Sequence, residues 1–239
     1  MDSKIVFNGK WHEDLCPVNH AENGTKCHEL CEGKIALRNM YSYSNIPPRF
    51  ILGGNIDFKL TSAQDKPAFK YLEVWRRNAF ENVKNKESLF IHSSGKGNGK
   101  TSWACDIAHT FMVQVFERGL SPTRPRVVYV SVSKLMEMMR QAMDDPDVNK
   151  EKQQFLKNIY RANLIILDDL GAERSSEYVI EQLYILINDL YNKEKSIIVT
   201  SNFNIQQIEE RLGGRIADRI RGMCIDVELK GGSKRGVRK

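Results

Sequence analysis

Residues 90–104 read FIHSSGKGNGKTSWA, and a glycine-rich stretch lies here between two apolar runs. The first run has the composition of a strand, and the second begins a segment with the spacing of a helix. A glycine-rich turn between a strand and a helix can point several backbone N–H groups at an anion, at the positive end of the helix. The stretch therefore predicts a site for nucleotide phosphates. The competing interpretation is a flexible turn that carries an incidental lysine.

The second half of this stretch, GNGKT at residues 97–101, ends as a P-loop ends. The usual pattern is G-x-x-x-x-G-K-[ST], and Ser94 occupies its first glycine position here. Serine is small and accepts many turn conformations, and Gly95 follows it, so the geometry of the loop remains available. In such a loop Lys100 would reach the β- and γ-phosphates, and Thr101 would be a ligand of Mg²⁺.

Apolar runs typical of strands alternate with helical patterns along the rest of the chain. This alternation predicts a parallel sheet covered by helices on both faces. A stripe of methionine and leucine in residues 133–145 is expected to be core, with Ser133 as the N-cap. The expected strands are residues 88–93, 126–132, 161–171, 196–202 and 224–229. The expected helices are residues 66–84, 101–119, 133–145 and 175–194, and a pair within 205–222 that is broken at Gly213-Gly214.

Two aspartates end the apolar run LIILDDLGAE at residues 164–173. Ligands of open α/β sheets bind at the carboxyl ends of strands, so this position favours a functional site over a solvated turn. Asp168 would hold Mg²⁺ through its water shell, and Asp169 would orient or deprotonate an attacking water.

Two later segments offer further groups for phosphate chemistry. Asn202 ends the run IIVTSN and could donate a hydrogen bond to the γ-phosphate or to the water, although any polar residue can close a strand. Arg215 and Arg219 are four residues apart and share a helix face. An arginine of this kind can stabilise transition-state charge across a subunit boundary, or it can lie on a basic face that contacts solvent or DNA.

Composition limits the broad class of the protein. The chain has 239 residues, of which 41% are apolar, and this suits one large domain or one domain with a small module. It has no apolar run long enough for a transmembrane helix and no secretory signal, so we expect a cytoplasmic protein without membrane contact. The net charge of +6 falls within residues 211–239, which hold nine Lys/Arg and three Asp/Glu. This basic end favours contact with a polyanion, or it is a solvated tail.

Three of the five cysteines fall in one short polar segment near the start of the chain. In a cytosolic protein, clustered cysteines predict metal ligands before disulfides. Three thiols and an imidazole can close a tetrahedral zinc site, with His28 and His12 as alternatives to His20 for the imidazole. The predicted ligands are Cys16, His20, Cys27 and Cys31. Pro47-Pro48 forces an extended boundary, so we expect an N-terminal module over residues 1–45 and a second domain over 46–239.

The segments SGKGNGKT, LIILDDLGAE, VTSN and RIADRIR follow one another in the order and rough spacing of the DnaC/DnaI-type bacterial and phage helicase loaders. Those loaders are AAA+ ATPases. The resemblance covers about residues 45–222, and NIPPRF looks like the segment that precedes the ATPase domain in that family. It implies an AAA+ P-loop NTPase fold that uses ATP and Mg²⁺. It also implies an N-terminal module that grips the hexameric replicative helicase, with zinc in some members.

The resemblance also implies the roles of individual residues. Asp168 and Asp169 match Walker B, Asn202 matches sensor 1, and Arg219 matches the arginine finger, with Arg215 the weaker match. Asp169 stands where many AAA+ proteins have glutamate, so its reach to water is shorter, and slow hydrolysis would suit a switch better than a motor. The implied nucleotide-binding residues are Gly95, Lys96, Gly97, Asn98, Gly99, Ser102 and Asp168, with Lys100 and Thr101 as the Walker A pair.

The sequence supports three hypotheses for function. The first is an ATP-dependent loader that places the replicative helicase on single-stranded DNA, self-associates through its AAA+ domain and has weak ATPase activity stimulated by DNA or by its partner. The second is an IstB-like transposition helper, which has the same motif set but binds duplex DNA and contacts a transposase. The third is a nucleotide-binding adaptor with little turnover, motivated by the departures at Ser94 and Asp169.

Overall fold

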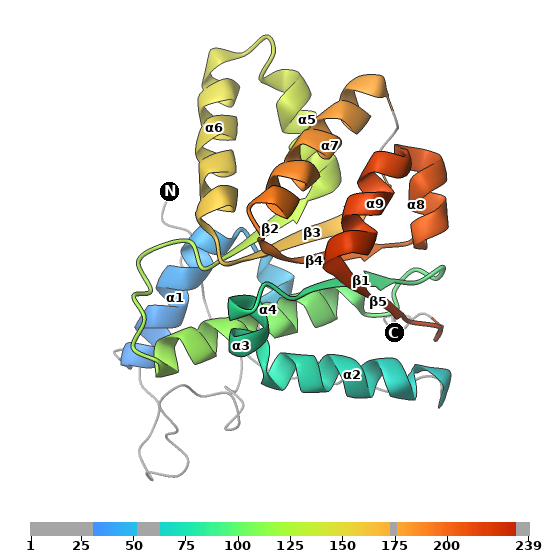
Figure 1. Ribbon diagram of the computed structural model, residues 1–239. Coiled ribbons are helices and arrows are strands. Elements are labelled where there is room, and N and C mark those ends of the chain that lie inside the picture. Colours follow the sequence, from blue (N-terminus) through green and yellow to red (C-terminus); the bar gives the residue numbers. More distant parts are fainter. Residues whose placement is uncertain (1–30, 52–62, 173–175, 233–239) are drawn as a thin grey trace, which may run out of the picture.

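The computed structural model describes residues 31–51, 63–172 and 176–232. Five parallel strands form one sheet in the order β2-β3-β4-β1-β5 (Figure 1). The predicted α/β architecture with a parallel sheet is therefore confirmed, and each strand lies within or close to its expected range. The strands are β1 (Ser88–His92), β2 (Val127–Ser131), β3 (Leu164–Leu170), β4 (Ser196–Ser201) and β5 (Cys224–Glu228).

Helices cover both faces of the sheet, and Figure 1 shows α1 to α4 on one side and α5 to α9 on the other. The first layer comprises α1 (Glu32–Ser44), α2 (Lys66–Arg77), α3 (Ala79–Lys84) and α4 (Lys100–Glu117), with short 3-10 turns η2 (Pro48–Phe50) and η3 (Ala63–Asp65). The second layer comprises α5 (Val132–Gln141), α6 (Pro146–Arg161), α7 (Glu177–Asn192), α8 (Ile205–Leu212) and α9 (Gly214–Met223).

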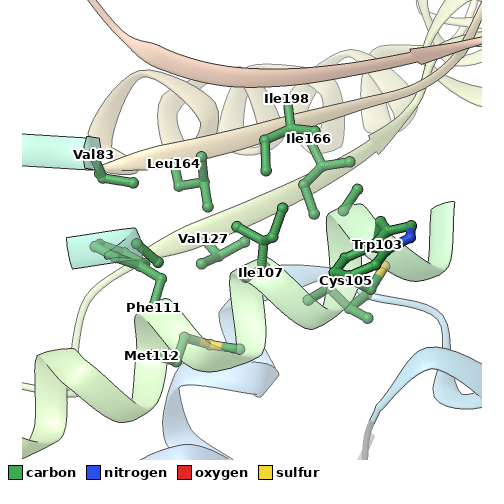
Figure 2. Packing of buried hydrophobic residues seen from close by; sticks show 14 of the residues in the cluster. Val83, Trp103, Cys105, Ile107, Phe111, Met112, Val127, Leu164, Ile166 and Ile198 are labelled. Atoms are coloured by element: carbon green, nitrogen blue, oxygen red, sulfur yellow. The ribbon is translucent and has the colours of Figure 1, made fainter. Parts of the chain in front are cut away.

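The alternation of side chains along each strand divides the core into two clusters. Leu89 and Ile91 of β1 pack with α1 to α4, whereas Phe90 between them packs with α5 to α9. Successive side chains of a strand point to opposite faces, so a strand covered on both sides must be apolar throughout. Figure 2 shows the first cluster, in which Ile107 of α4 lies against Val127 and Ile166 of the sheet.

Two helices in the described part were not predicted, and one predicted helix is divided. The first half of α6, PDVNKEKQ, holds one apolar residue, Val148, and Ile159 is the one fully buried side chain of the helix. Its start is nevertheless marked by Asp145, whose carboxylate accepts hydrogen bonds from the backbone N–H of Asp147 and Val148. The expected helix over residues 66–84 is interrupted at Asn78, which separates α2 from α3.

The expected N-cap of α5 was wrong by two residues. Ser131 occupies that position, and its side chain makes no capping hydrogen bond. Ser133 lies inside the first turn and is exposed. The predicted core role of the methionine stripe is confirmed for Met136 and Met139, while Met143 beyond the end of the helix is exposed.

The second unpredicted helix, α1, packs against α4 and the sheet. Leu37, Met40 and Tyr41 are buried in the same cluster as α4. The structure does not describe the first 30 residues, so the expected domain boundary near residue 45 stays a prediction. No helix in the described ranges is long and apolar enough to span a bilayer.

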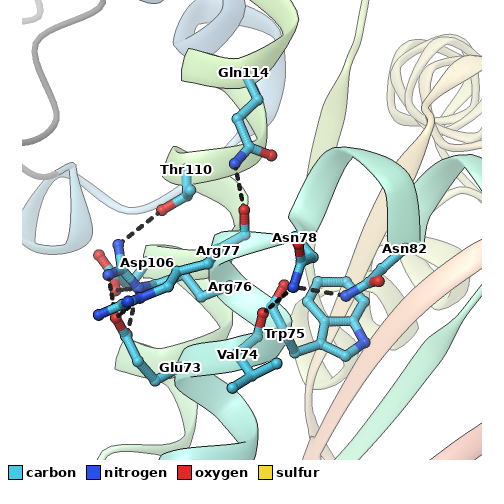
Figure 3. A network of polar contacts seen from close by, with 10 residues as sticks. All are labelled: Glu73, Val74, Trp75, Arg76, Arg77, Asn78, Asn82, Asp106, Thr110 and Gln114. Carbon is cyan, nitrogen blue, oxygen red and sulfur yellow. Dashed lines mark hydrogen bonds and ion pairs between the residues drawn. The ribbon is translucent and has the colours of Figure 1, made fainter.

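A polar network joins α2 to α4 beside this core (Figure 3). The Arg76 guanidinium lies 2.8 Å from Glu73, 3.5 Å from Asp106 and 3.2 Å from the Thr110 hydroxyl. Its hydrogen bond lowers the pKa of the Glu73 carboxyl. The Gln114 side chain accepts from the Phe80 N–H and donates to the Arg77 carbonyl, each at 2.8 Å. These contacts fix the break between α2 and α3 by satisfying backbone groups that helix ends leave unpaired.

Candidate nucleotide-binding site

The carboxyl ends of β1, β4 and β3 lie side by side, because β4 is hydrogen-bonded to both of the others. The glycine-rich loop follows β1, the two aspartates lie near the end of β3, and Asn202 follows β4. Segments that are far apart in sequence therefore meet at one edge of the sheet, where open α/β sheets bind their ligands.

The loop after β1 has the backbone conformation that its glycines predict. Gly97 and Gly99 have φ of 82° and 91°, values that favour glycine, and Gly99 directly precedes α4. Ser94 is not among the described residues of positive φ, so serine at the first glycine position of the pattern costs no backbone strain. The Lys100 ammonium donates a hydrogen bond to the Gly95 carbonyl at 3.0 Å and is thereby folded back over the loop.

A hydrogen-bond network fixes the carboxylate of Asp168 against this loop. One oxygen accepts from the Thr101 hydroxyl at 2.8 Å and from the Thr200 hydroxyl at 2.7 Å, and the other accepts from the Tyr129 hydroxyl at 2.5 Å. Burial is the main cause that raises the pKa of Tyr129, and the charge of Asp168 adds to it. The phenol therefore keeps its proton and remains a donor. The carboxylate is therefore held by hydroxyls from two neighbouring strands and one helix.

Asp169 has an irregular backbone that the sequence did not predict. Its φ is 62°, and the pairing of β3 with β4 shifts between Leu167 and Leu170. Aspartate tolerates this left-handed conformation better than most residues, and such strain is concentrated at functional sites. The Asn202 amide donates to the Asp169 carboxylate at 2.6 Å, and the Asp169 N–H donates to the Thr200 hydroxyl at 3.0 Å.

The irregularity brings both aspartates to one cavity instead of to opposite faces of the sheet. That cavity has a volume of about 950 Å³, within the range of small-molecule sites. Its wall includes Tyr129, the start of α5 and the segment Asn45–Arg49. Sequence reasoning did not single out Tyr129, Thr200 or Arg49. Tyr129 and Thr200 lie near the carboxyl ends of β2 and β4, the two strands that neighbour β3. That position was the one signal in the sequence that could have identified them.

The donor set at this edge fits Mg²⁺. Asp168 and Thr101 supply a carboxylate and a hydroxyl in direct contact, and hard oxygen ligands of this kind are those that Mg²⁺ prefers. Lys100 begins α4 directly after the loop and is 7% exposed, and neither Lys100 nor Thr101 forms part of the wall of the cavity that holds the two aspartates.

The predicted arginines lie on α9, outside the wall of this cavity. Arg219 is half-buried, donates to the Asn188 side chain at 2.9 Å and stacks on Tyr191. Arg215 is exposed and lies 5.8 Å from the centre of the Tyr184 ring. Neither arginine contacts Asp168 among the described residues, so the role across a subunit boundary stays a prediction.

The predicted zinc site lies mostly outside the described residues, which exclude Cys16, His20 and Cys27. Cys31 is buried at the start of α1. In the ranges that the structure describes, no group of three or more His, Cys, Asp or Glu could hold a metal ion. The zinc site therefore stays a prediction, as does any role of the basic residues 233–239.

Comparisons with known proteins identify a matching family and similar sequences. The family described as IstB-like ATP binding protein matches residues 35–239. The replicative helicase loader DnaC of Escherichia coli is 25% identical over 136 residues, which are 55% of this chain and 49% of that protein. The chromosomal replication initiator protein DnaA of Enterococcus faecalis is 29% identical over 142 residues, which are 58% of this chain and 28% of that protein. The chain thus spans half or less of these two relatives.

Solved structures of related proteins share the fold. The DnaC helicase loader has a TM-score of 0.61 at 22% identity, over 76% of this chain and 99% of that one. The DnaI structure has a TM-score of 0.60 at 24% identity, over 77% and 95%. AMPPCP-bound DnaA from Aquifex aeolicus has a TM-score of 0.52 at 22% identity, over 70% and 48%. The fold is that of AAA+ P-loop domains, and the resemblance inferred from the motifs is confirmed.

Proposed function

The chain belongs to the family of IstB-like ATP-binding proteins, and from that premise we propose that it is an ATP-dependent loader of a replicative DNA helicase. One observation carries the nucleotide chemistry: the hydrogen bond between Thr101 of the glycine loop and Asp168 of the acidic strand. The likeness to proteins named as helicase loaders supports the biological role.

Each residue of the site has a distinct task in ATP hydrolysis. The N–H groups of residues 95–102 would cradle the phosphates, and Lys100 would neutralise charge on the β- and γ-phosphates. Thr101 and Asp168 would hold Mg²⁺, which supplies charge stabilisation to the transferred phosphoryl group when it is bound. Asp169 would accept a proton from the attacking water, and Asn202 would orient that carboxylate and the γ-phosphate.

The proposed turnover is slow in the isolated chain and is stimulated by single-stranded DNA or by the helicase. Asp169 is shorter than the glutamate that many AAA+ proteins have at this position, so its carboxylate reaches water less readily. It is also hydrogen-bonded to Asn202, and a partner that shifts this contact would release it. Hydrolysis would then free the loader from the helicase, as expected of a switch.

Self-association would complete the site. Arg219 of one copy would approach the γ-phosphate held by its neighbour, after leaving its contact with Asn188. Arg215 is the alternative because it is already exposed. Mixing a Lys100→Ala chain with an Arg219→Ala chain tests this arrangement, because a mixed pair holds one intact site. Restored ATPase activity supports Arg219, whereas restoration only with Arg215→Ala points to the other arginine.

The N-terminal residues 1–45 would dock on the hexameric helicase, with zinc held by Cys16, His20, Cys27 and Cys31. In so polar a segment, metal binding would supply much of the folding free energy. Removal of zinc with a chelator is therefore expected to abolish helicase binding while ATP binding persists.

The central test is Lys100→Ala, for which we expect loss of ATP binding and turnover. Lys70→Ala is the matched control, because it removes a lysine charge from an exposed position on α2, away from the loop. Full ATPase activity in the Lys100→Ala chain contradicts the assignment. A pull-down with the replicative helicase then tests the partner.

A transposition helper is the second candidate, favoured by the IstB-like description of the family. It predicts co-purification with a transposase and a preference for duplex DNA. A chain that binds ATP but shows no turnover stimulated by DNA or by the helicase would instead support an adaptor without useful hydrolysis.

A further inference from the structure

The amino edge of the sheet, opposite the nucleotide site, gathers basic side chains. In a parallel sheet the residues that directly precede the strands meet at one edge. Arg126 precedes β2 and Lys195 precedes β4, while Lys86 lies two residues before β1. The sequence therefore repeats a basic residue before three neighbouring or near-neighbouring strands, and only the strand order brings these residues together.

A cavity of about 280 Å³ opens at this edge, and we name it the amino-edge cavity. Apolar side chains of α3 and α4 form part of its wall. Five basic side chains and one acidic side chain also line it: Lys84, Lys86, Arg124, Arg126, Lys195 and Glu194. An opening lined in this way carries an excess of positive charge.

These cations have few acidic partners. Lys84 lies 3.5 Å from Glu81, and both side chains are exposed, so water screens this pair. The other four form no ion pair with a carboxylate of the described residues. Lys195 donates to the Ala162 carbonyl at 3.0 Å, which leaves two of its three ammonium hydrogens for another acceptor.

Hydrogen bonds hold Arg126 in the wall of the cavity. The Arg126 guanidinium is 4% exposed as a residue and donates to the Ser121 carbonyl at 3.0 and 2.8 Å, and to the Asn163 side chain at 3.3 Å. Its own donors are thus used to fix the turn before β2. Burial, then the positive charges of Lys86, Lys193 and Arg124, lowers the pKa of Lys195, as expected where cations face each other.

We propose that the amino-edge cavity binds a backbone phosphate of nucleic acid, with Lys195 inside the cavity and the exposed Lys86 and Arg124 at its rim. The size of the cavity favours a polymer over a free cofactor. Its volume is at the lower end of the roughly 300–1,000 Å³ of small-molecule sites, so it would hold a phosphate group while the rest of a larger ligand lies outside. Exposed lysine and arginine at the rim would contact the flanking phosphates. The inference rests on the proposed function only in taking nucleic acid as the source of the phosphate.

The test compares two double variants of the full chain. Lys86→Gln with Arg124→Gln removes the rim cations, and neither side chain supports the fold beyond one long contact of Arg124 with Asn163 at 3.5 Å. Lys70→Gln with Arg140→Gln is the matched control, because it removes the same charges from exposed positions on α2 and α5. Affinity for a fluorescent single-stranded oligothymidylate is measured by anisotropy across a salt series.

We expect the rim variant to bind about tenfold more weakly, and the slope of log affinity against log salt to fall by about 0.7 for each lost contact. The control variant and the unmodified chain should agree with each other. ATP affinity and thermal unfolding should be the same in all three chains.

Three results overturn the inference. One is equal DNA affinity in the rim variant and its control, and another is an unmodified chain that binds ATP but no DNA. The third concerns two competitors of DNA binding, pyrophosphate and polyglutamate. If the rim variant differs from its control only in how strongly one of these competitors binds, the cavity is a site for a small phosphate or for an acidic protein. Failure of the unmodified chain to bind ATP would instead contradict the proposed function, so the two failures are distinguishable.

Discussion

The two edges of the sheet differ in how their polar side chains are organised. At the carboxyl edge Asp168 accepts hydrogen bonds from three hydroxyls, and Asp169 accepts one from Asn202. At the amino edge Lys195 and Arg126 donate to backbone carbonyls, and further cations stand beside them. The first arrangement fixes positions, whereas the second accumulates charge.

This difference indicates what each edge can recognise. A fixed carboxylate beside a glycine loop suits a ligand whose atoms must be placed for reaction, because catalysis depends on preorganised geometry. Exposed cations around an opening suit a flexible polyanion, because counterion release requires proximity more than exact geometry. Substitutions at the two edges should therefore change different observables: ATP turnover at the carboxyl edge and DNA affinity at the amino edge.

The largest expected effect is that of Asp168→Asn. The amide still accepts from Thr101 and Thr200, but the negative charge that would hold Mg²⁺ is lost. We expect ATP hydrolysis to fall about 1,000-fold, measured as phosphate release over a range of Mg²⁺ concentrations. Asp144→Asn at an exposed position is the control. Unchanged turnover in the Asp168 variant would show that this edge does not position a metal.

The second prediction concerns the middle of α4, which belongs to neither edge. His109 is buried and hydrogen-bonded to the Tyr41 hydroxyl at 2.6 Å. Burial, then the charge of Arg76, lowers its pKa from 6.5 to about 4. Between pH 4 and pH 6.5 His109 binds a proton more readily in the unfolded chain than in the folded one. Its neutral form therefore contributes fully to the unfolding free energy above pH 6.5, and this contribution is lost as the pH falls toward 4. It amounts to about 3 kcal/mol.

Denaturant unfolding over this pH window checks the prediction. His109→Gln should show a smaller loss of unfolding free energy on acidification than the unmodified chain, since the carboxylates titrate alike in both. Identical pH slopes in the two chains would contradict the assignment. DNA affinity and ATP turnover depend on the two edges of the sheet. At neutral pH they should therefore be the same in the His109→Gln chain and in the unmodified chain.

The third prediction separates binding from hydrolysis at the carboxyl edge. Asparagine also tolerates the left-handed backbone of residue 169, and it can keep the contact with Asn202. Asp169→Asn should therefore retain ATP binding and stability while hydrolysis falls about 100-fold. Asp169→Ala should lose in addition about 1 kcal/mol of unfolding free energy from strain at positive φ. Loss of ATP binding in the asparagine variant would contradict a role in hydrolysis alone.

The smallest expected effect belongs to the amino edge. Lys195→Gln can keep a hydrogen bond to the Ala162 carbonyl but removes one charge from the cavity. We expect about threefold weaker binding of single-stranded DNA and a salt slope smaller by about 0.7, with ATP turnover in the absence of DNA unchanged. Lys70→Gln is the control. A change in that basal turnover without a change in DNA affinity would show that the two edges are not independent.

Much of the carboxyl edge of the sheet could be predicted from the sequence. GNGKT predicted a loop before a helix, and the apolar run before Asp168 and Asp169 predicted a buried strand, because these local patterns leave few alternatives. The helices α1 and α6 were not predicted, and the first half of α6, PDVNKEKQ, has the polar composition of a loop. The left-handed conformation of Asp169 and the hydroxyl donors Thr200 and Tyr129 also gave no local signal.

What the sequence determined by itself was the set of strands, the loop conformation that its glycines permit, and the acidic pair that ends a strand. These depend on short-range sterics and on hydrophobic periodicity. Only the tertiary structure decided that β4 lies between β1 and β3, because strand order depends on packing across the whole sheet. That order joins Thr101, Tyr129 and Thr200 to one carboxylate at one edge, and it gathers Lys86, Arg126 and Lys195 at the other.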